Sequence, residues 1–333
     1  MSRVVDRVLI YGATGYTGRM VALQAKAAGL DVVIAARDAG KLAALARELD
    51  LPSSAFPLDA ASLAASLAGF HTVLNCAGPF ARTAEPLMRA CIEAGVHYLD
   101  ITAEINVYRL AEHLGPDAAR AGVMLLPGVG WDVVPTDCLA LQLSRRVAQP
   151  MSLRIALQVA GSMSRGSAVS AGEIVGAGLM ARVNGALVPT PEAEPALFDF
   201  GNGDGEVVCA PLSFGDLVTA WHSTGIPDIA MFVNVTGTAF PSGELSELPD
   251  GPSQEERDAQ RARAVVEVTG AGGEVARAVI ETVNGYSYTP LAAVEAARRV
   301  LGGAHRAGFE TPARVFGDDF AQGIAGTVIT HIA

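Results

Sequence analysis

The sequence predicts an α/β fold: a Rossmann-type doubly wound parallel sheet followed by a second, α+β domain with a mixed or antiparallel sheet. In the first part of the chain, apolar strand-like runs alternate with helical segments, and a glycine-rich turn follows the first run. After about residue 150 this alternation stops and period-two patterns take over. A chain of 333 residues is long enough for about two domains.

The elements of the first domain follow from the apolar runs and the residues that punctuate them. Strands are expected at 7–11, 31–36, 55–56, 72–75, 97–99 and 123–126, and helices at 15–28, 40–49, 60–67 and 83–94. Because crossovers between parallel strands are right-handed, a doubly wound sheet is the simplest topology that this order allows.

The second region has a different pattern. Strands are expected at 153–160 and 229–236, a helix at 173–183, an exposed loop with a short helix at 240–258, and a hairpin whose strands 262–268 and 275–281 flank the glycine-rich residues 270–273. The predicted domains are 1–150, 151–288 and a C-terminal segment, 289–333, that returns to the first domain. The hairpin and strand 229–236 offer sheet edges, which predicts a homodimer through the second domain.

Composition excludes several classes of protein. The net charge is −11 and no basic run is longer than two residues, as at Arg145-Arg146, which argues against nucleic-acid binding. No run of ~18 apolar residues or N-terminal signal segment is evident, so no membrane span is expected. The four cysteines form no CxxC pair, which fits a cytoplasmic protein with reduced thiols, and no metal site is predicted.

The glycine-rich turn is the strongest functional signal. It follows a predicted strand and opens a helix, the context in which such a turn holds a dinucleotide. Gly12 permits the tight turn, Gly15 lets the backbone approach a pyrophosphate, and Gly18 allows close packing of the helix. The predicted cofactor-binding residues of this turn are Gly12, Ala13, Thr14, Gly15, Tyr16, Thr17 and Gly18. The alternative is an ordinary turn in an α/β domain.

The end of the second strand predicts NADP as the cofactor. An acid at this position would bind the ribose hydroxyls of NAD, whereas an arginine accommodates the 2′-phosphate of NADP. Arg37 is the first polar residue after the strand, and Lys41 follows one helical turn later. The alternative is that Arg37 is merely solvated while Asp38 caps a helix. Asp59 lies where the adenine is often bound, and a helix-capping role is equally compatible with its position.

Several stretches resemble the saccharopine dehydrogenase-like group, including its trans-acting enoyl reductase branch. These stretches are 10–18, 75–80, 97–104, 128–137 and 308–313. The resemblance implies an NADP-binding domain, a second domain built on a mixed sheet, and a C-terminal segment that rejoins the first domain. It also implies that the loop 75–80 lies beside the ribose and nicotinamide, with Asn75, Ala77, Gly78, Pro79 and Phe80 as cofactor-binding residues. The chain is short for the saccharopine-forming members and has no lysine after Lys41, which argues against that particular substrate.

The proton donor for hydride transfer has several candidates. The Tyr-x-x-x-Lys pair of short-chain dehydrogenases is absent, because Lys26 and Lys41 are the only lysines and neither has a tyrosine four positions before it. The catalytic candidates are Asp132, Tyr98 and His222, with Asp100 and Glu104 as further acids near the expected nicotinamide end. For Asp132, a helix-capping role is equally compatible with the sequence. The turn 164–167 could hold an anionic substrate group or simply cap a helix.

Together these features predict an NADP(H)-dependent oxidoreductase that reduces a small carbonyl, imine or enoyl substrate by hydride transfer. Two alternatives are left open by the residues alone. One is a non-redox enzyme that uses a tightly held cofactor, and the other is a non-catalytic NADP-binding regulatory protein.

Overall fold

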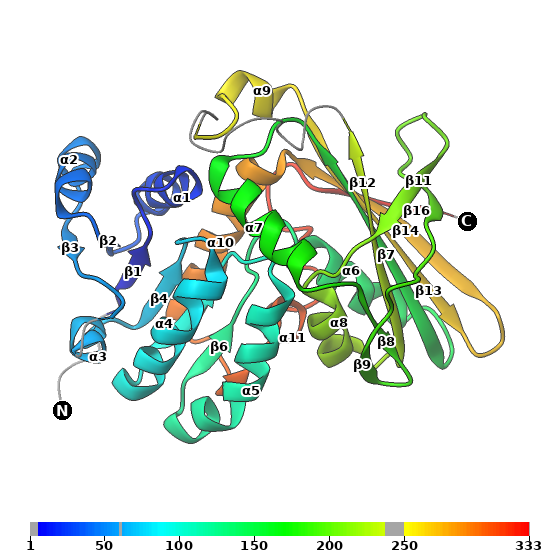
Figure 1. Ribbon diagram of the computed structural model, residues 1–333, viewed down its shortest axis with the longest axis horizontal. Coiled ribbons are helices and arrows are strands. Elements are labelled where there is room, and N and C mark those ends of the chain that lie inside the picture. The colour runs from blue at the N-terminus through cyan, green and yellow to red at the C-terminus, as the bar shows by residue number, and fades with distance from the viewer. Residues whose placement is uncertain (1–5, 60–61, 237–249, 333) are drawn as a thin grey trace. The chain divides into compact units, whose positions relative to one another are not determined.

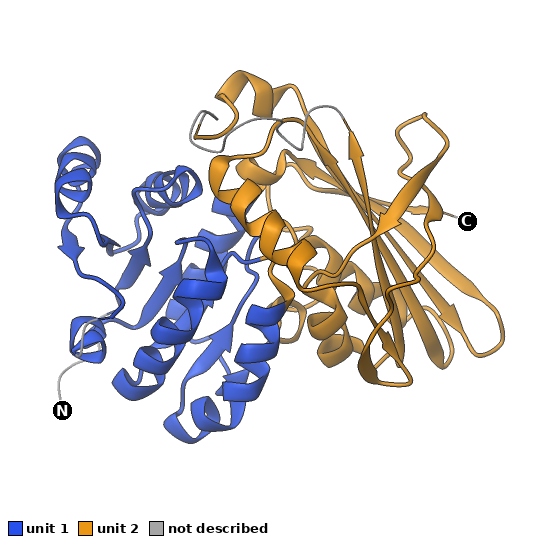
Figure 2. Cartoon of the chain, viewed as in Figure 1, with its two compact units in different colours: residues 1–102, 106–130, 289–310 blue, residues 103–105, 131–288, 311–333 orange. Residues whose placement is uncertain are grey.

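The computed structural model describes residues 6–59, 62–236 and 250–332 (Figure 1). The chain folds into two compact units, coloured separately in Figure 2. Unit 1 contains residues 1–102, 106–130 and 289–310, and unit 2 contains residues 103–105, 131–288 and 311–333. The chain therefore passes between the units several times. The domain limits expected from the sequence stay a prediction.

Unit 1 is built on a seven-stranded sheet in which every pairing is parallel, in the order β15-β6-β5-β4-β1-β2-β3. The strands are β1 (Val8–Tyr11), β2 (Val32–Ala36), β3 (Ser53–Ala55), β4 (Thr72–Asn75), β5 (His97–Asp100), β6 (Met124–Leu126) and β15 (Gly308–Phe309). The strand order reverses direction at β1, which defines a doubly wound sheet. The predicted Rossmann-type fold is confirmed.

Helices connect these strands, as Figure 1 shows. They are α1 (Tyr16–Ala27), α2 (Ala39–Leu49), α3 (Leu63–Leu67), α4 (Phe80–Ala94), α5 (Ile105–Ala121) and most of α10 (Gly285–Leu301). The sequence pattern predicted the first four correctly to within a few residues and indicated no helix between residues 100 and 122. The central strands β1, β2, β4 and β5 are buried along their whole length, which explains the unbroken apolar runs of β1 and β2.

Unit 2 is built on a mixed sheet of nine strands, in the order β10-β11-β12-β7-β13-β14-β16, with β8 paired to β12 and β9. The strands are β7 (Pro150–Ala160), β8 (Met180–Val183), β9 (Ala186–Pro189), β10 (Ala196–Asp199), β11 (Glu206–Pro211), β12 (Asp228–Thr236), β13 (Arg261–Gly270), β14 (Val275–Val283) and β16 (Val328–Ile332). Among the described strands of unit 2, only β7 and β12 pair in parallel; the other pairs are antiparallel. The predicted second domain with a mixed sheet is confirmed.

The described helices of unit 2 are α6 (Val134–Ser144), α7 (Arg165–Gly176), α8 (Asp216–Thr224), α9 (Gln254–Asp258) and α11 (Pro312–Phe316). Three of them form a group on the sheet. Helix α6 contacts β7, β13 and β14, while α8 and α11 contact α6. Leu153, Ile155 and Leu157 of β7 share one face of the strand and are all buried. Ala156, on the other face, is also buried, in a cluster with Phe198 and Phe232.

Two expectations for this region need correction. The helix predicted at 173–183 ends at Gly176, and Met180–Val183 forms β8 instead. The predicted hairpin is present, but β12, β13 and β14 are interior strands; among the described residues, the ends of the main strand path are β10 and β16. The edge argument for a homodimer therefore fails, and the homodimer itself stays a prediction.

Of the loop predicted at 240–258, residues up to 249 lie outside the described part, and α9 follows.

Among the described helices, none is both long and apolar enough to cross a membrane. The cytoplasmic location stays a prediction.

A buried carboxylate joins three helices of unit 2. Asp137 of α6 is fully buried, and one of its oxygens accepts a hydrogen bond from the Ser223 hydroxyl of α8 at 2.6 Å. The other oxygen accepts from the backbone N–H of Ala313 in α11 at 2.8 Å. Burial raises the pKa of Asp137, and the hydrogen bonds oppose this rise. Asp137 is therefore a structural residue.

We expect Asp137→Asn to destabilise the protein by about 2–3 kcal/mol, because an amide group cannot accept both hydrogen bonds and one buried donor is left unpaired. Ser223→Ala removes one donor only and should cost about 1 kcal/mol. Urea unfolding followed by circular dichroism measures both free energies. Equal stability of Asp137→Asn and the wild type would contradict this structural role.

Candidate cofactor and active site

The glycine-rich turn lies at the carboxyl end of β1. Gly12 has φ +86°, a conformation that residues with a Cβ rarely adopt. The backbone N–H groups of Gly12 and Ala13 both donate to the carbonyl of Ala35 in β2, at 2.8 and 3.2 Å. The turn is thus fixed against the neighbouring strand.

The other two glycines of the turn differ in their surroundings. A Cβ added to Gly18 would lie 2.2 Å from the carbonyl oxygen of Gly12, too close for any side chain. A Cβ added to Gly15 would meet only this same oxygen, at 3.4 Å. Gly18 is therefore required by packing of α1 against the turn, whereas Gly15 has an open side from which a ligand can reach the backbone.

The first turn of α1 is available to an anion. Gly15 is the N-cap residue and no side chain caps the helix. Since the first N–H groups of a helix have no partners inside it, and since the helix dipole is positive here, a phosphate is the group that this end suits. Thr14 and Gly15 are exposed, Tyr16 and Thr17 are half-buried, and Ala13 is buried. These positions fit the predicted pyrophosphate contacts, which stay a prediction.

Arg37 and Asp59 gather around Tyr11, the last residue of β1. Burial raises the pKa of Tyr11, the positive charge of Arg37 lowers it, and the negative charge of Asp59 raises it. The Tyr11 hydroxyl donates to the carbonyl of Phe56 at 3.2 Å. Arg37 and Asp59 are both exposed, so their charged groups are open to a ligand. Tyr11 was not among the site residues predicted from the sequence, although an aromatic residue directly before Gly12 already indicated a side chain beside the turn.

Asp38 has the helix-capping role considered above. Its carboxylate accepts a hydrogen bond from the backbone N–H of Lys41 at 3.0 Å and so caps α2. This leaves the exposed side chains of Arg37 and Lys41 to act separately from the cap. Asp59 does not cap α3, because Ser62 is the residue before that helix.

The loop 75–80 is fixed by the buried side chain of Asn75. Its carbonyl oxygen accepts from the N–H of Ala77 at 3.0 Å, and its amide donates to the hydroxyls of Thr83 and Tyr98 at 3.2 and 3.1 Å. Thr83 in turn donates to the carbonyl of Ala77 at 2.6 Å. A Cβ on Gly12 would lie 2.6 Å from the nitrogen of Ala77, so this loop packs directly on the glycine turn.

The remaining loop residues have graded exposure. Gly78 is exposed, Pro79 and Ala77 are half-buried, and Phe80 is buried at the start of α4. The loop therefore presents its 77–79 backbone at the same end of the sheet as the glycine turn. This placement is compatible with the implied nicotinamide and ribose contacts.

The buried hydroxyl of Tyr98 both donates and accepts a hydrogen bond. It donates to one oxygen of Asp100 at 2.8 Å and accepts from Asn75. The other oxygen of Asp100 accepts from the N–H groups of Thr102 and Gly128, at 3.0 and 2.9 Å. Burial, followed by the Asp100 charge, raises the pKa of Tyr98 well above its usual value. This arrangement favours a positioning role for Tyr98, which holds Asn75, over proton donation to a substrate.

The catalytic candidates of unit 2 differ in accessibility. Asp132 is partly exposed, and burial raises its pKa to about 6. It does not cap α6, because Val133 is the N-cap residue. His222 lies half-buried in the last turn of α8. Glu104 is buried and accepts from the hydroxyl of Ser170 at 2.7 Å.

The turn 164–167 has the capping role that the sequence allowed. The Ser164 hydroxyl accepts from the N–H of Ser167 at 3.0 Å at the start of α7. An anionic ligand at this helix stays a prediction.

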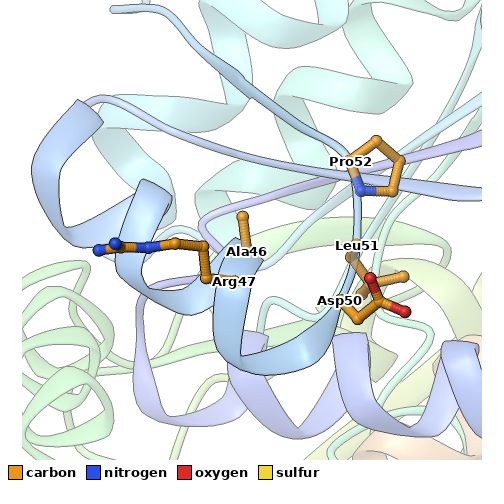
Figure 3. Close-up of a pocket in the computed structure, with 5 residues that line it drawn as sticks. All are labelled: Ala46, Arg47, Asp50, Leu51 and Pro52. Carbon is orange, nitrogen blue, oxygen red and sulfur yellow. The ribbon is translucent and has the colours of Figure 1, made fainter.

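A surface pocket of about 500 Å³ lies away from these residues, between the end of α2 and the start of β3 (Figure 3). Its lining residues are Ala46, Arg47, Asp50, Leu51 and Pro52. Because α2 returns from the carboxyl to the amino ends of the strands, this pocket lies at the opposite end of the sheet from the glycine turn. It has no part in the candidate site.

The parallel sheet and the glycine-rich turn of unit 1 are typical of dinucleotide-binding α/β domains. Residues 8–126 match the family model described as the saccharopine dehydrogenase NADP binding domain. The resemblance stated from the sequence is thereby confirmed, and the match supports NADP as the cofactor.

Known relatives agree with this assignment. A trans-acting enoyl reductase of Mycobacterium tuberculosis is 32% identical over 148 residues, which are 42% of this chain and 35% of that protein. The corresponding protein of Mycobacterium leprae is 30% identical over 151 residues, covering 43% of this chain and 36% of that protein. The match therefore spans about a third of the length of these relatives.

The fold of both units has a counterpart among solved structures. An apo saccharopine dehydrogenase (L-Glu forming) from Saccharomyces cerevisiae superimposes with a TM-score of 0.64 and 14% identity, over 98% of this chain and 100% of that chain. At this identity the similarity concerns the fold alone.

Gly18 and Gly15 of the turn predict different mutant properties. Gly18→Ala should destabilise the protein by about 1–3 kcal/mol or more, because its methyl group overlaps the Gly12 carbonyl. Gly15→Ala should fold normally, since Gly15 has φ −80°, but the methyl group should weaken NADPH binding at least tenfold, or about 1.4 kcal/mol. Thermal unfolding and fluorescence titration with NADPH separate these effects. Normal NADPH affinity in Gly15→Ala would show that the phosphates do not approach this residue.

Proposed function

We propose that this chain is an NADP(H)-dependent oxidoreductase that reduces a small carbonyl, imine or enoyl substrate by hydride transfer. The observation that carries the proposal is the combination of an uncapped, glycine-turn helix α1 with exposed Arg37 at the carboxyl end of β2. The match of residues 8–126 to the model of an NADP-binding domain family supports it. The mycobacterial relatives are named enoyl reductases, which favours a C=C substrate among the three classes.

Within this proposal, the chain's own residues have separate tasks. The N–H groups of α1 bind the pyrophosphate, Arg37 and Lys41 bind the 2′-phosphate, and Asp59 lies toward the adenosine. The loop 75–80, which Asn75 fixes, supports the nicotinamide end. NADPH supplies the hydride, and a protein group supplies the proton to the atom that becomes basic.

Asp132 is the proposed proton donor. It is partly exposed, and a carboxyl group with a pKa of about 6 is still protonated in a useful fraction near neutral pH. Tyr98 is the positioning residue behind Asn75. His222 remains the second candidate in unit 2, half-buried at the end of α8.

Arg37 provides the test of the cofactor. Its guanidinium group matches the geometry of a phosphate, and a charge-assisted hydrogen bond contributes about 1.5–3 kcal/mol, roughly a ten- to hundredfold change in affinity. Arg37→Ala should weaken NADPH binding by this factor and leave NADH binding nearly unchanged. Arg47→Ala, an exposed arginine later in α2, is the matched control and should bind NADPH like the wild type.

Two results of these titrations would contradict the assignment. One is equal affinity of the wild type for NADH and NADPH. The other is an Arg37→Ala protein that loses both cofactors equally, which would give Arg37 a role in folding.

The pH dependence tests Asp132. A general acid acts in its protonated form, so kcat/KM for reduction should be constant below pH 6 and fall about tenfold per pH unit above it. Asp132→Asn should lower kcat on the order of 100-fold and abolish this pH dependence. Assays use NADPH oxidation with a panel of carbonyl, imine and enoyl compounds, and Asp258→Asn in α9 is the control. A mutant with unchanged kcat would exclude Asp132 as the acid.

The same assays separate the alternatives. Product formed without net NADPH oxidation would indicate a non-redox enzyme. Cofactor that binds and is never oxidised with any compound in the panel would indicate a regulatory protein.

A further inference from the structure

Three histidines from distant parts of the sequence meet at one place in unit 1. His71 directly precedes β4, His97 opens β5, and His305 lies between α10 and β15. One ring nitrogen from each lies within 4.8 Å of those of the other two. The ring centroids are 4.2 Å apart for His97 and His305, 5.1 Å for His71 and His97, and 5.9 Å for His71 and His305.

Two of these rings are held by the sheet. Strands β4 and β5 are parallel neighbours, with Thr72 opposite His97, and the backbone N–H of His97 donates to the carbonyl of His71 at 3.0 Å. His97 is buried, His71 is half-buried and His305 is exposed. The cluster therefore has a fixed base of two rings and one adaptable ring that faces water.

The polar partners of the two fixed rings determine how each ring could bind a metal ion. Nδ1 of His71 lies 2.9 Å from the hydroxyl oxygen of Thr72, and donation to that oxygen would leave the Nε2 lone pair available. Nδ1 of His97 accepts from the N–H of Met124 at 3.0 Å, which places the proton of the neutral ring on Nε2. A metal ion at this Nε2 would have to displace that proton to solvent, so His97 would bind as an imidazolate whose Nδ1 keeps the hydrogen bond from the Met124 N–H.

We propose that His71, His97 and His305 form a binding site for one divalent late transition-metal ion, of which Zn²⁺ is the representative, at the amino ends of β4 and β5. Imidazole nitrogens are ligands that Zn²⁺, Cu²⁺ and Ni²⁺ all accept. With Zn–N bonds of about 2.0–2.1 Å, tetrahedral ligand nitrogens lie about 3.4 Å apart, so the cluster must contract by up to about 1.4 Å. Rotation of the exposed His305 side chain supplies much of this movement, and water completes the coordination.

From the position of the site we expect a bound ion to affect stability and not catalysis. The amino ends of the strands are opposite the carboxyl ends that carry the glycine turn and Arg37. A bound ion would tie the segment before β15 to β4 and β5, so it should stabilise the fold without taking part in hydride transfer.

The test uses untagged protein, because a polyhistidine tag would bind the same ions. Calorimetric titration with Zn²⁺ alone should show one site per wild-type chain, and His305→Ala should bind at least tenfold more weakly, because outer-shell changes already cost about 10–100-fold. His113→Ala, an exposed histidine in α5 outside the cluster, should bind like the wild type. Circular dichroism of the metal-free His305→Ala protein checks its fold.

Two further readouts identify the ligands. Zn²⁺ should raise the Tm of the wild type and of His113→Ala, but not that of His305→Ala. Cu²⁺ bound in place of Zn²⁺ should give an electron paramagnetic resonance spectrum with three nitrogen ligands. The proposal is overturned by the absence of saturable one-to-one binding, by equal Zn²⁺ affinity of His305→Ala and the wild type, or by a spectrum with fewer than three nitrogens.

Discussion

Close approach of backbone to backbone at the carboxyl end of β1 is the constraint on which unit 1 depends. The α1 helix can begin where it does only because Gly18 brings no side chain against the carbonyl of Gly12. The loop after β4 can close over the same turn only because Gly12 has no Cβ to meet Ala77. Three chain segments therefore converge without side chains between them, and this leaves backbone N–H groups, rather than methyl groups, facing the ligand position.

A buried network of hydrogen bonds fixes the conformation of the loop after β4, which packs on the glycine turn. Asn75 and Asp100 are the last residues of β4 and β5, and Tyr98 lies within β5. Their hydrogen bonds connect the loop after β4 with the chain after β5 and β6. Each of these groups has its partners inside the network, so burial carries little penalty and the loop geometry is well defined. The network supports the proposed positioning role of Tyr98.

Unit 2 contains buried acids in two kinds of surroundings. Asp137 has hydrogen-bond donors on both oxygens and joins α6, α8 and α11. Asp216 is equally buried, and burial, followed by the charge of Asp137, raises its pKa well above the usual value. The charge of Asp132 acts on Asp216 in the same direction. Asp132, the accessible member of the three, therefore lies in surroundings that favour the protonated carboxyl group.

The sequence by itself determined the Rossmann-type sheet, the turn from Gly12 to Gly18 and the NADP-binding class, because strand–helix alternation and glycine spacing are local patterns. It missed α5, misassigned β8 and placed interior strands at an edge, because strand pairing depends on segments far apart in the chain. The tertiary structure alone decided that Tyr98 is buried, that Asp132 is not a cap, and that His71, His97 and His305 meet. Burial, hydrogen-bond partners and convergence of distant residues arise from the packing of the whole chain, and no local spacing encodes them.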